Sequence, residues 1–234
     1  MCAVLSLTGI VTALLAIGAL FGGPGLAGRL IEGSLAGAGL QGTATTVRVL
    51  TDPPWELLEG HADRVEIHSE QVSADQVQVR SLDLTLLDGE LASSDFERLE
   101  GRLDGVTLRT ADGSTIEIER VDLAGPPEAV EATIRIPAAE VERVALAAMQ
   151  AQTGVSGGEA SLQAPDVIVF SVFLFRVEGR IVVEPDGSLT MAVNLPGNPR
   201  VQLVPGDPLR FTSVTVVAEA LVLTGQVNAT GLLP

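Results

Sequence analysis

The sequence predicts a β-rich α+β domain in which antiparallel strands pack against one long amphipathic helix. Three observations lead to this prediction. Beyond Thr43, most of the chain consists of short segments in which apolar and polar residues alternate, as in strands with one buried face. Turn dipeptides such as Asp112-Gly113 separate the segments, so neighbouring strands are expected to pair antiparallel. Within this pattern, residues 137–153 have apolar residues at helical spacing, and such a helix needs a sheet face on which to bury them.

The composition favours a large aliphatic core and argues against nucleic-acid binding. Of 234 residues, 46% are hydrophobic but only 3% are aromatic, so aliphatic side chains supply the apolar surface. The net charge is -16 and all 14 Lys or Arg positions are arginine, a surface that repels phosphate backbones. It is also a poor electrostatic match for anionic membranes, so apolar surface would have to drive any membrane contact. The single cysteine, Cys2, supports neither a disulfide framework nor a thiolate metal cluster.

Residues 1–24 are predicted to be an export signal or a membrane anchor, followed by one domain over residues 25–234. Ala3 to Phe21 is apolar, free of charge and nearly long enough to cross a bilayer as a helix. A cleaved signal and an uncleaved anchor remain open, since Met1-Cys2 lacks the basic residues that normally open a signal. Either interpretation places the domain outside the cytoplasmic membrane. A buried core helix is the weaker alternative.

The first part of the domain is predicted to contain a short helix, a turn and several strands. Leu26 to Leu40 has leucines at helix-like spacing, although several glycines weaken the pattern. From Thr43 to Val49 the period changes to two, and Asp52-Pro53-Pro54-Trp55 ends this strand. Glu56 to Gly60 can form one helical turn. Further strands are predicted over Asp63–Ser69, over Val77–Val79 and Leu82–Leu86 before an Asp88-Gly89 turn, over Leu103–Arg109, over Thr115–Glu119 with a phase slip near Arg120, and over Ala129–Ile136.

Residues 137–153, PAAEVERVALAAMQAQT, contain the predicted long helix. Pro137 suits the first helical position, where its missing N–H costs nothing, and Gly154 suits the residue beyond the end. The apolar residues at helical spacing form one stripe, which we predict to face the sheet and to contact lipid. The stripe consists of Val141, Val144, Ala145 and Ala148.

Val167 to Val177, VIVFSVFLFRV, is apolar on both faces and too short to span a membrane as a helix. It can be a central strand covered on both sides. Alternatively, one face packs on the helix and the other lines an apolar groove for lipid chains. The second interpretation makes Val169, Phe170, Phe173 and Phe175 candidate lipid contacts. The rest of the chain is predicted to form a hairpin through Pro185-Asp186-Gly187 and strands over Leu209–Val217, Glu219–Leu223 and Gln226–Leu232.

The residue pattern does not support catalysis or metal binding, so we predict no catalytic residue, metal or cofactor. The only histidines are His61, beside a turn, and His68, on a polar strand face, and no G-x-S-x-G motif occurs. Carboxylates such as Glu117 and Glu119 lie near arginines in the sequence, as on a solvated face, and no His/Cys cluster indicates a transition metal. Trp55 has two interpretations, an interfacial membrane anchor and ordinary loop packing.

The order of these segments resembles the LmeA-type family of bacterial phospholipid-binding proteins. The likeness covers nearly all of the chain after Gly25, and the order of the stretches carries it more than any single stretch. The similar stretches are RLIEGSLAGAGL (Arg29–Leu40), VRVLTDPPWELLEGHADRVEI (Val47–Ile67), VQVRSLDLTLLDGEL (Val77–Leu91), ATIRIPAAEVERVAL (Ala132–Leu146) and SVTVVAEALVLTG (Ser213–Gly225).

The resemblance implies a curved antiparallel sheet wrapped around one long amphipathic helix, preceded by an N-terminal apolar helix, as in half of a tubular lipid-binding domain. It also implies a non-enzymatic protein, exported or tethered to the membrane. We therefore predict a cell-envelope protein that binds phospholipid or another acyl lipid in a groove between the sheet and residues 137–153. The membrane would be contacted through residues 1–24. The alternative is a structural or protein-interaction module of the envelope, with a filled core and no ligand.

Overall fold

The computed structural model describes most of the chain between residues 41 and 227. The described ranges are 41–74, 77–90, 95–109, 115–153, 157–172, 175–194, 200–204 and 209–227. The predicted signal or anchor over residues 1–24 and the predicted helix over Leu26–Leu40 lie outside these ranges, and so does Phe173. Among the helices that the structure describes, none combines the length and the apolar character needed to cross a membrane.

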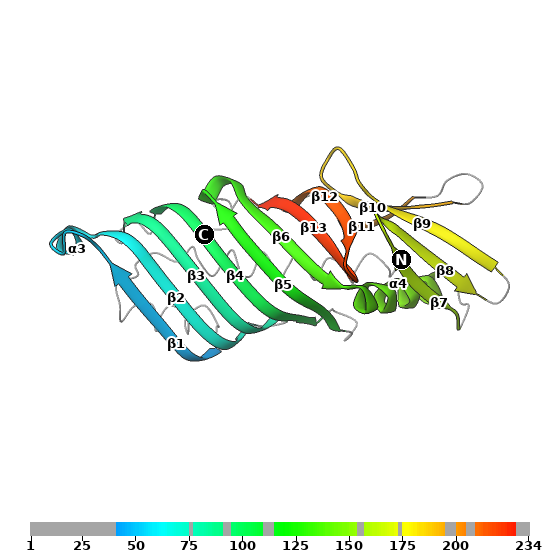
Figure 1. Ribbon diagram of the computed structural model, residues 1–234, viewed down its shortest axis with the longest axis horizontal. Coiled ribbons are helices and arrows are strands. Elements are labelled where there is room, and N and C mark those ends of the chain that lie inside the picture. The colour runs from blue at the N-terminus through cyan, green and yellow to red at the C-terminus, as the bar shows by residue number, and fades with distance from the viewer. Residues whose placement is uncertain are drawn as a thin grey trace. The chain divides into compact units, whose positions relative to one another are not determined.

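An eight-stranded antiparallel sheet contains most of the described strands. Its members are β1 (Gln41–Leu50), β2 (His61–Ala74), β3 (Val77–Glu90), β4 (Asp95–Arg109), β5 (Thr115–Gly125), β6 (Val130–Pro137), β12 (Leu209–Val217) and β13 (Ala220–Val227). The strand order is β1-β2-β3-β4-β5-β6-β13-β12, so the first six strands form a meander in chain order (Figure 1). The one-turn helix α3 (Glu56–Glu59) connects β1 to β2, and the 3₁₀ turn η1 (Pro127–Ala129) connects β5 to β6. Alternating sequence with local turns therefore produces antiparallel neighbours, as predicted.

A second sheet contains five strands from the segment after the long helix. They are β7 (Glu159–Gln163), β8 (Val167–Val172), β9 (Phe175–Val183), β10 (Leu189–Val193) and β11 (Arg200–Val204), in the order β11-β10-β9-β8-β7. The predicted hairpin between β9 and β10 is confirmed, with Leu189 opposite Val183. The predicted single strand over Val167–Val177 is wrong, because Val172 lies opposite Phe175 and the chain reverses between them. None of the residues there is a Gly, Pro, Asn or Asp that would indicate a reversal.

The described residues divide into two compact units. The meander unit contains residues 41–107, Arg120–Ala132 and Val227, and the helix unit contains Leu108–Glu119 and Thr133–Gln226. Strands β4, β5, β6 and β13 contribute residues to both units. The five-stranded sheet lies entirely within the helix unit.

The predicted arrangement of a curved sheet wrapped around one long amphipathic helix is wrong. A helix does form over Ala138–Thr153 (α4), but no sheet wraps around it, and it packs on β7. Glu142 of α4 accepts a hydrogen bond from the backbone N–H of Leu162 in β7 at 2.8 Å. The side chains of Val141, Val144 and Ala145 are only half-buried. Many of the residues of α4 are alanines, whose small side chains bury little apolar surface against a neighbouring element. The most buried side chains belong to the strands instead.

The first turn of α4 is fastened to the beginning of β5. Glu140 accepts two hydrogen bonds from Arg143, at 2.9 Å from Nε and 2.5 Å from Nη2, and a third from the backbone N–H of Glu117 at 2.9 Å. Arg143 also donates to the carbonyl of Thr115. Burial alone would raise the pKa of the Glu140 carboxyl. The hydrogen bonds from Arg143 and Glu117 and the positive charge of Arg143 outweigh this effect, so the pKa lies below its ordinary value.

A two-residue turn joins β12 to β13. Ala218 and Glu219 have φ angles of 44° and 61°, so both are in the left-handed region, as in the type I′ turns that suit the twist of a hairpin. The turn contacts β6 and α4 through its backbone, since Glu219 O accepts from Ala138 N–H at 2.8 Å and Ala218 O accepts from Arg135 at 3.4 Å. Neither Ala nor Glu is a residue that favours this conformation.

Of two predicted interruptions, the phase slip near Arg120 is found in the structure and the turn at Asp88-Gly89 is not. In β5 the buried positions change from Ile116 and Ile118 to Val121 and Leu123, which confirms the predicted phase slip near Arg120. The predicted Asp88-Gly89 turn is wrong, because β3 continues to Glu90. Asp88 has a φ of 52° inside the strand, and the pairs on either side keep one register.

Candidate functional site

The predicted lipid-contact residues of α4 do not line a sheet-bounded groove in the described structure. Val141, Val144 and Ala145 are half-buried on a helix that packs on β7, and the side chain of Ala148 lies outside the described part. Their role in lipid binding stays a prediction.

The predicted contacts on Val167–Val177 separate onto two strands. Val169 and Phe170 are adjacent in β8, so they point to opposite faces of the sheet, and each is only 4% exposed. This matches a strand covered on both sides. Phe175 begins β9 opposite Val172, although its side chain is not described, and Phe173 lies outside the described residues. The four residues therefore do not share one face.

A continuous aliphatic face, which the sequence analysis had not singled out as a site, runs across the meander unit. Across β2 and β3 its members lie directly opposite one another, with Ile67 against Leu84 and Val72 against Val79. Each member is at most 9% exposed. The aliphatic face consists of Val65, Ile67, Val72, Val77, Val79, Leu82, Leu84, Leu99, Leu103, Val106, Val121, Leu123, Val130 and Ala132.

Gly101 shows how closely this face is packed across β3, β4 and β5. A Cβ atom at Gly101 would lie 2.6 Å from Cδ2 of Leu84 and 3.6 Å from Cβ of Leu123. The first distance is shorter than the closest approach of two non-bonded carbon atoms. Only glycine, which has no Cβ, therefore allows the Leu84 side chain to lie where it does. The side chains of three strands thus meet on one side of the sheet.

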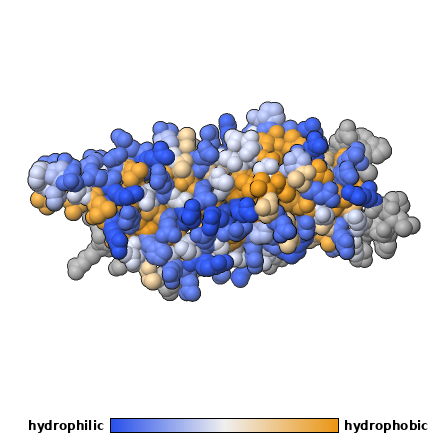
Figure 2. Space-filling model, in the orientation of Figure 1, coloured by the Kyte–Doolittle hydropathy of each residue, from blue (hydrophilic) through white to orange (hydrophobic). Residues whose placement is uncertain are grey.

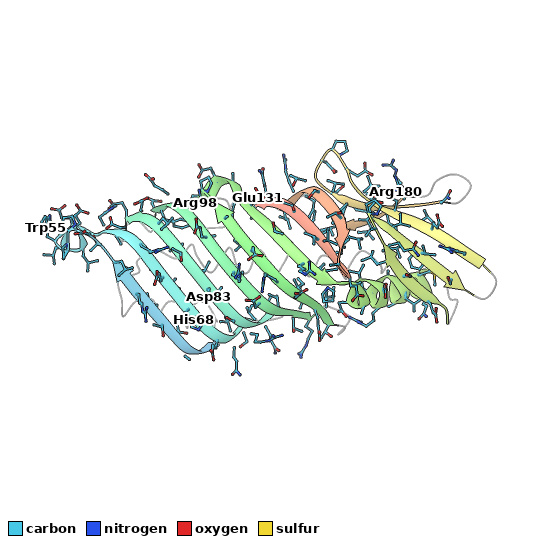
Figure 3. All side chains as sticks on the ribbon, viewed as in Figure 1. Trp55, His68, Asp83, Arg98, Glu131 and Arg180 are labelled. Carbon is cyan, nitrogen blue, oxygen red and sulfur yellow. The ribbon has the colours of Figure 1, made fainter. Side chains whose placement is uncertain are left out.

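The opposite side of the same strands carries pairs of polar side chains. His68 Nδ1 and Asp83 Oδ1 lie 2.6 Å apart on β2 and β3 (Figure 3). Arg102 of β4 contacts Asp122 of β5 at 2.9 Å. These pairs are about half exposed, so each adds little to stability, but together they keep this side of the sheet in water.

The contrast between the two sides limits what the aliphatic face can do chemically. Buried polar residues among those described are Ser69, Ser188 and Thr190, and none of them is charged. Ser69, the one on this part of the sheet, is hydrogen-bonded to Thr45 at 2.9 Å. The described side chains of this face therefore offer apolar contacts to whatever covers it.

One group of side chains has the composition of a metal site, contrary to the expectation from sequence. Ligand atoms of Glu56, His61 and Asp63 all lie within 4.8 Å of one another. His61 Nε2 is 3.6 Å from Asp63 Oδ1, and its Nδ1 is 3.3 Å from Glu90 Oε1. The side chains are partly exposed, and the contacts also match an ordinary cluster of one histidine with carboxylates. A closed zinc site would require a fourth ligand.

The connection between β1 and β2 exposes apolar side chains. Trp55 is 63% exposed, Leu57 43% and Leu58 90%, so the interpretation of Trp55 as ordinary loop packing does not hold. Sequence reasoning had noted Trp55 but neither leucine, because an isolated leucine pair carries no sign of exposure.

Comparison of the chain with protein-family models, with curated proteins and with solved structures gave no match. The class of protein is therefore inferred from the fold and the surfaces described above.

Proposed function

We propose that this protein is a non-enzymatic lipid-binding protein of the cell envelope, with acyl chains held against the aliphatic face of the meander unit. The observation that supports the proposal most is the face itself, an uncharged aliphatic surface that spans β2 to β6. It replaces the predicted groove between sheet and α4 as the place where lipid would bind.

Acyl chains need long apolar walls with few hydrogen-bond donors, because any unpaired polar group in the wall would lose its water without compensation. Aliphatic strands provide such walls. Each methylene group removed from water contributes about 0.8 kcal/mol, so a chain of ordinary length binds well without polar contacts. The resemblance to the LmeA-type family and the apolar run at Ala3–Phe21 support the same function, and they suggest an extracytoplasmic location.

The alternative is a structural or protein-interaction module of the envelope with a filled core. The low exposure of the aliphatic face favours it, since at most 9% of any member is accessible. In this case the face would be an ordinary core, and a lipid would have to displace what shields it.

Native mass spectrometry of the full chain, purified from bacterial membranes and freed of detergent, distinguishes the two functions. A carrier retains a stoichiometric adduct of lipid mass, and organic extraction of the same sample identifies the lipid. Ile67→Phe and Leu84→Phe enlarge side chains on the face and should lower the lipid-bearing fraction. Glu66→Gln, on the opposite side of β2, is the matched control and should leave it unchanged. A chain that is free of lipid after incubation with mixed lipids supports the structural module.

A further inference from the structure

We propose that the β1–β2 tip, defined as residues Trp55–Leu58, inserts into the headgroup region of an electrically neutral lipid bilayer. This proposal does not depend on lipid binding in the sheet. Trp55, Leu57 and Leu58 are among the five large hydrophobic side chains that are exposed in the described structure, and they are consecutive but for Glu56. Leu58 is 90% exposed, which means that it protrudes beyond its neighbours.

The exposure is fixed by the backbone. The α3 turn is closed by hydrogen bonds from Leu58 N–H to Trp55 O at 2.9 Å and from Glu56 N–H to Pro53 O at 3.2 Å. Gly60 ends it with a φ of 93°, and its N–H bonds to Leu57 O at 3.2 Å. The backbone of the tip is therefore ordered before it meets a partner, and only the exposed side chains remain to be ordered on contact.

The shape and chemistry of the tip fit a bilayer interface. The tip lies at the α3 end of β1 and β2, and apolar side chains reach the surface at that end (Figures 2 and 3). The headgroup layer of a bilayer is fluid, so it can rearrange around a protruding turn. An indole beside leucines is the combination enriched at that depth, because the ring is apolar and its N–H can still hydrogen-bond.

The charge of the tip selects the kind of bilayer. Three carboxylates, Asp52, Glu56 and Glu59, lie in or beside the tip, and the nearby histidine, His61, lies in a cluster with Glu56 and Asp63. An anionic membrane would repel the carboxylates, whereas a zwitterionic surface would not. The predicted export or anchoring by residues 1–24 also brings the chain to a membrane.

The sequence provides a direct probe, because Trp55 is the only tryptophan and the chain has no tyrosine. The full chain is titrated with phosphatidylcholine vesicles while the emission of Trp55 is recorded. We expect a shift to shorter wavelength, and quenching when the vesicles contain lipids brominated on their acyl chains. Leu58→Asp should raise the vesicle concentration at half-shift by about tenfold, since one leucine no longer leaves water.

Val217→Asp is the matched control, because Val217 is 49% exposed on β12, remote in sequence from the tip. It should leave the titration unchanged, and circular dichroism checks that both variants fold. The proposal is overturned if the Trp55 emission stays unshifted at the highest vesicle concentration and is still quenched by iodide in the aqueous phase. It is also overturned by a shift that appears without vesicles as the protein concentration rises, which would identify a second copy as the occupant. A shift in a chain that carries no lipid adduct would retain this proposal and refute the proposed function.

Discussion

Glu140 is expected to stabilise the helix unit more through the backbone of β5 than through its ion pair with Arg143. The Glu140 side chain is 13% exposed and accepts from Glu117 N–H, whereas the Arg143 side chain is 49% exposed. A hydrogen bond to a charged group contributes about 1.5–3 kcal/mol. An exposed pair within one helix contributes only about 0.5 kcal/mol. Glu140→Ala should therefore lower the free energy of unfolding by about 2–3 kcal/mol.

Arg143→Ala removes the ion pair and the bond to Thr115 O but leaves the bond between Glu140 and Glu117. It should lower the free energy of unfolding by about 1 kcal/mol. Urea unfolding measures the free energies of both variants. Far-ultraviolet circular dichroism is the suitable signal, because the only tryptophan lies in the meander unit and its fluorescence would not report on the helix unit. If Arg143→Ala costs as much as Glu140→Ala, the reasoning is wrong and the ion pair dominates.

The same carboxylate makes stability depend on pH in a definite direction. The pKa of Glu140 is lower in the folded protein than its ordinary value of 4.5. Its contribution is therefore complete above the ordinary pKa and is lost as the pH falls through the lower folded value. Glu140→Gln lacks this contribution, so the difference in unfolding free energy between wild type and variant should shrink below about pH 4.5. A difference that stays constant in acid would contradict the assignment.

The remaining predictions concern backbone conformation and the core. Gly187→Ala should destabilise more than Gly157→Ala, because both residues have positive φ but only at Gly187 would a Cβ lie 2.9 Å from the backbone of β12; we expect a difference above about 1 kcal/mol in urea unfolding. Leu103→Ala, at a side chain 1% exposed, should cost about 2–5 kcal/mol, with a smaller loss indicating that the face is not packed. Replacing Ala218 and Glu219 by Asn-Gly should raise the melting temperature, since both residues have positive φ.

Local pattern in the sequence predicted elements better than it predicted their contacts. The alternation around Val65 and Ile67 and the helical spacing after Pro137 each reflect the period of one element, which the chain itself determines. Which surface covers α4 depends instead on segments distant in sequence. The alanines of α4 fit the helical period, but each can bury only a small apolar surface. An apolar stripe that contains them therefore does not require a sheet to wrap around the helix.

The candidate surfaces were less accessible to sequence reasoning. The reversal between Val172 and Phe175 has no Gly, Pro, Asn or Asp to indicate it, so the apolar run predicts a single strand. The aliphatic face needs three strands brought together around Gly101, a relation that no single window of sequence contains. The exposure of Leu58 runs against the general tendency of leucine to be buried, and only the structure can reveal such an exception.

The strand order has a consequence for synthesis on the ribosome. β6 is bordered by β5 on one side and by β13 on the other, yet α4 and the whole five-stranded sheet are translated between β6 and β13. During that interval β6 is paired with β5 on one edge only, and the free N–H and C=O groups of its other edge can recruit strands from other chains. The closing contact also spans a long loop, which slows its formation. Truncation before β12 should therefore yield a chain prone to aggregate and not a smaller soluble domain.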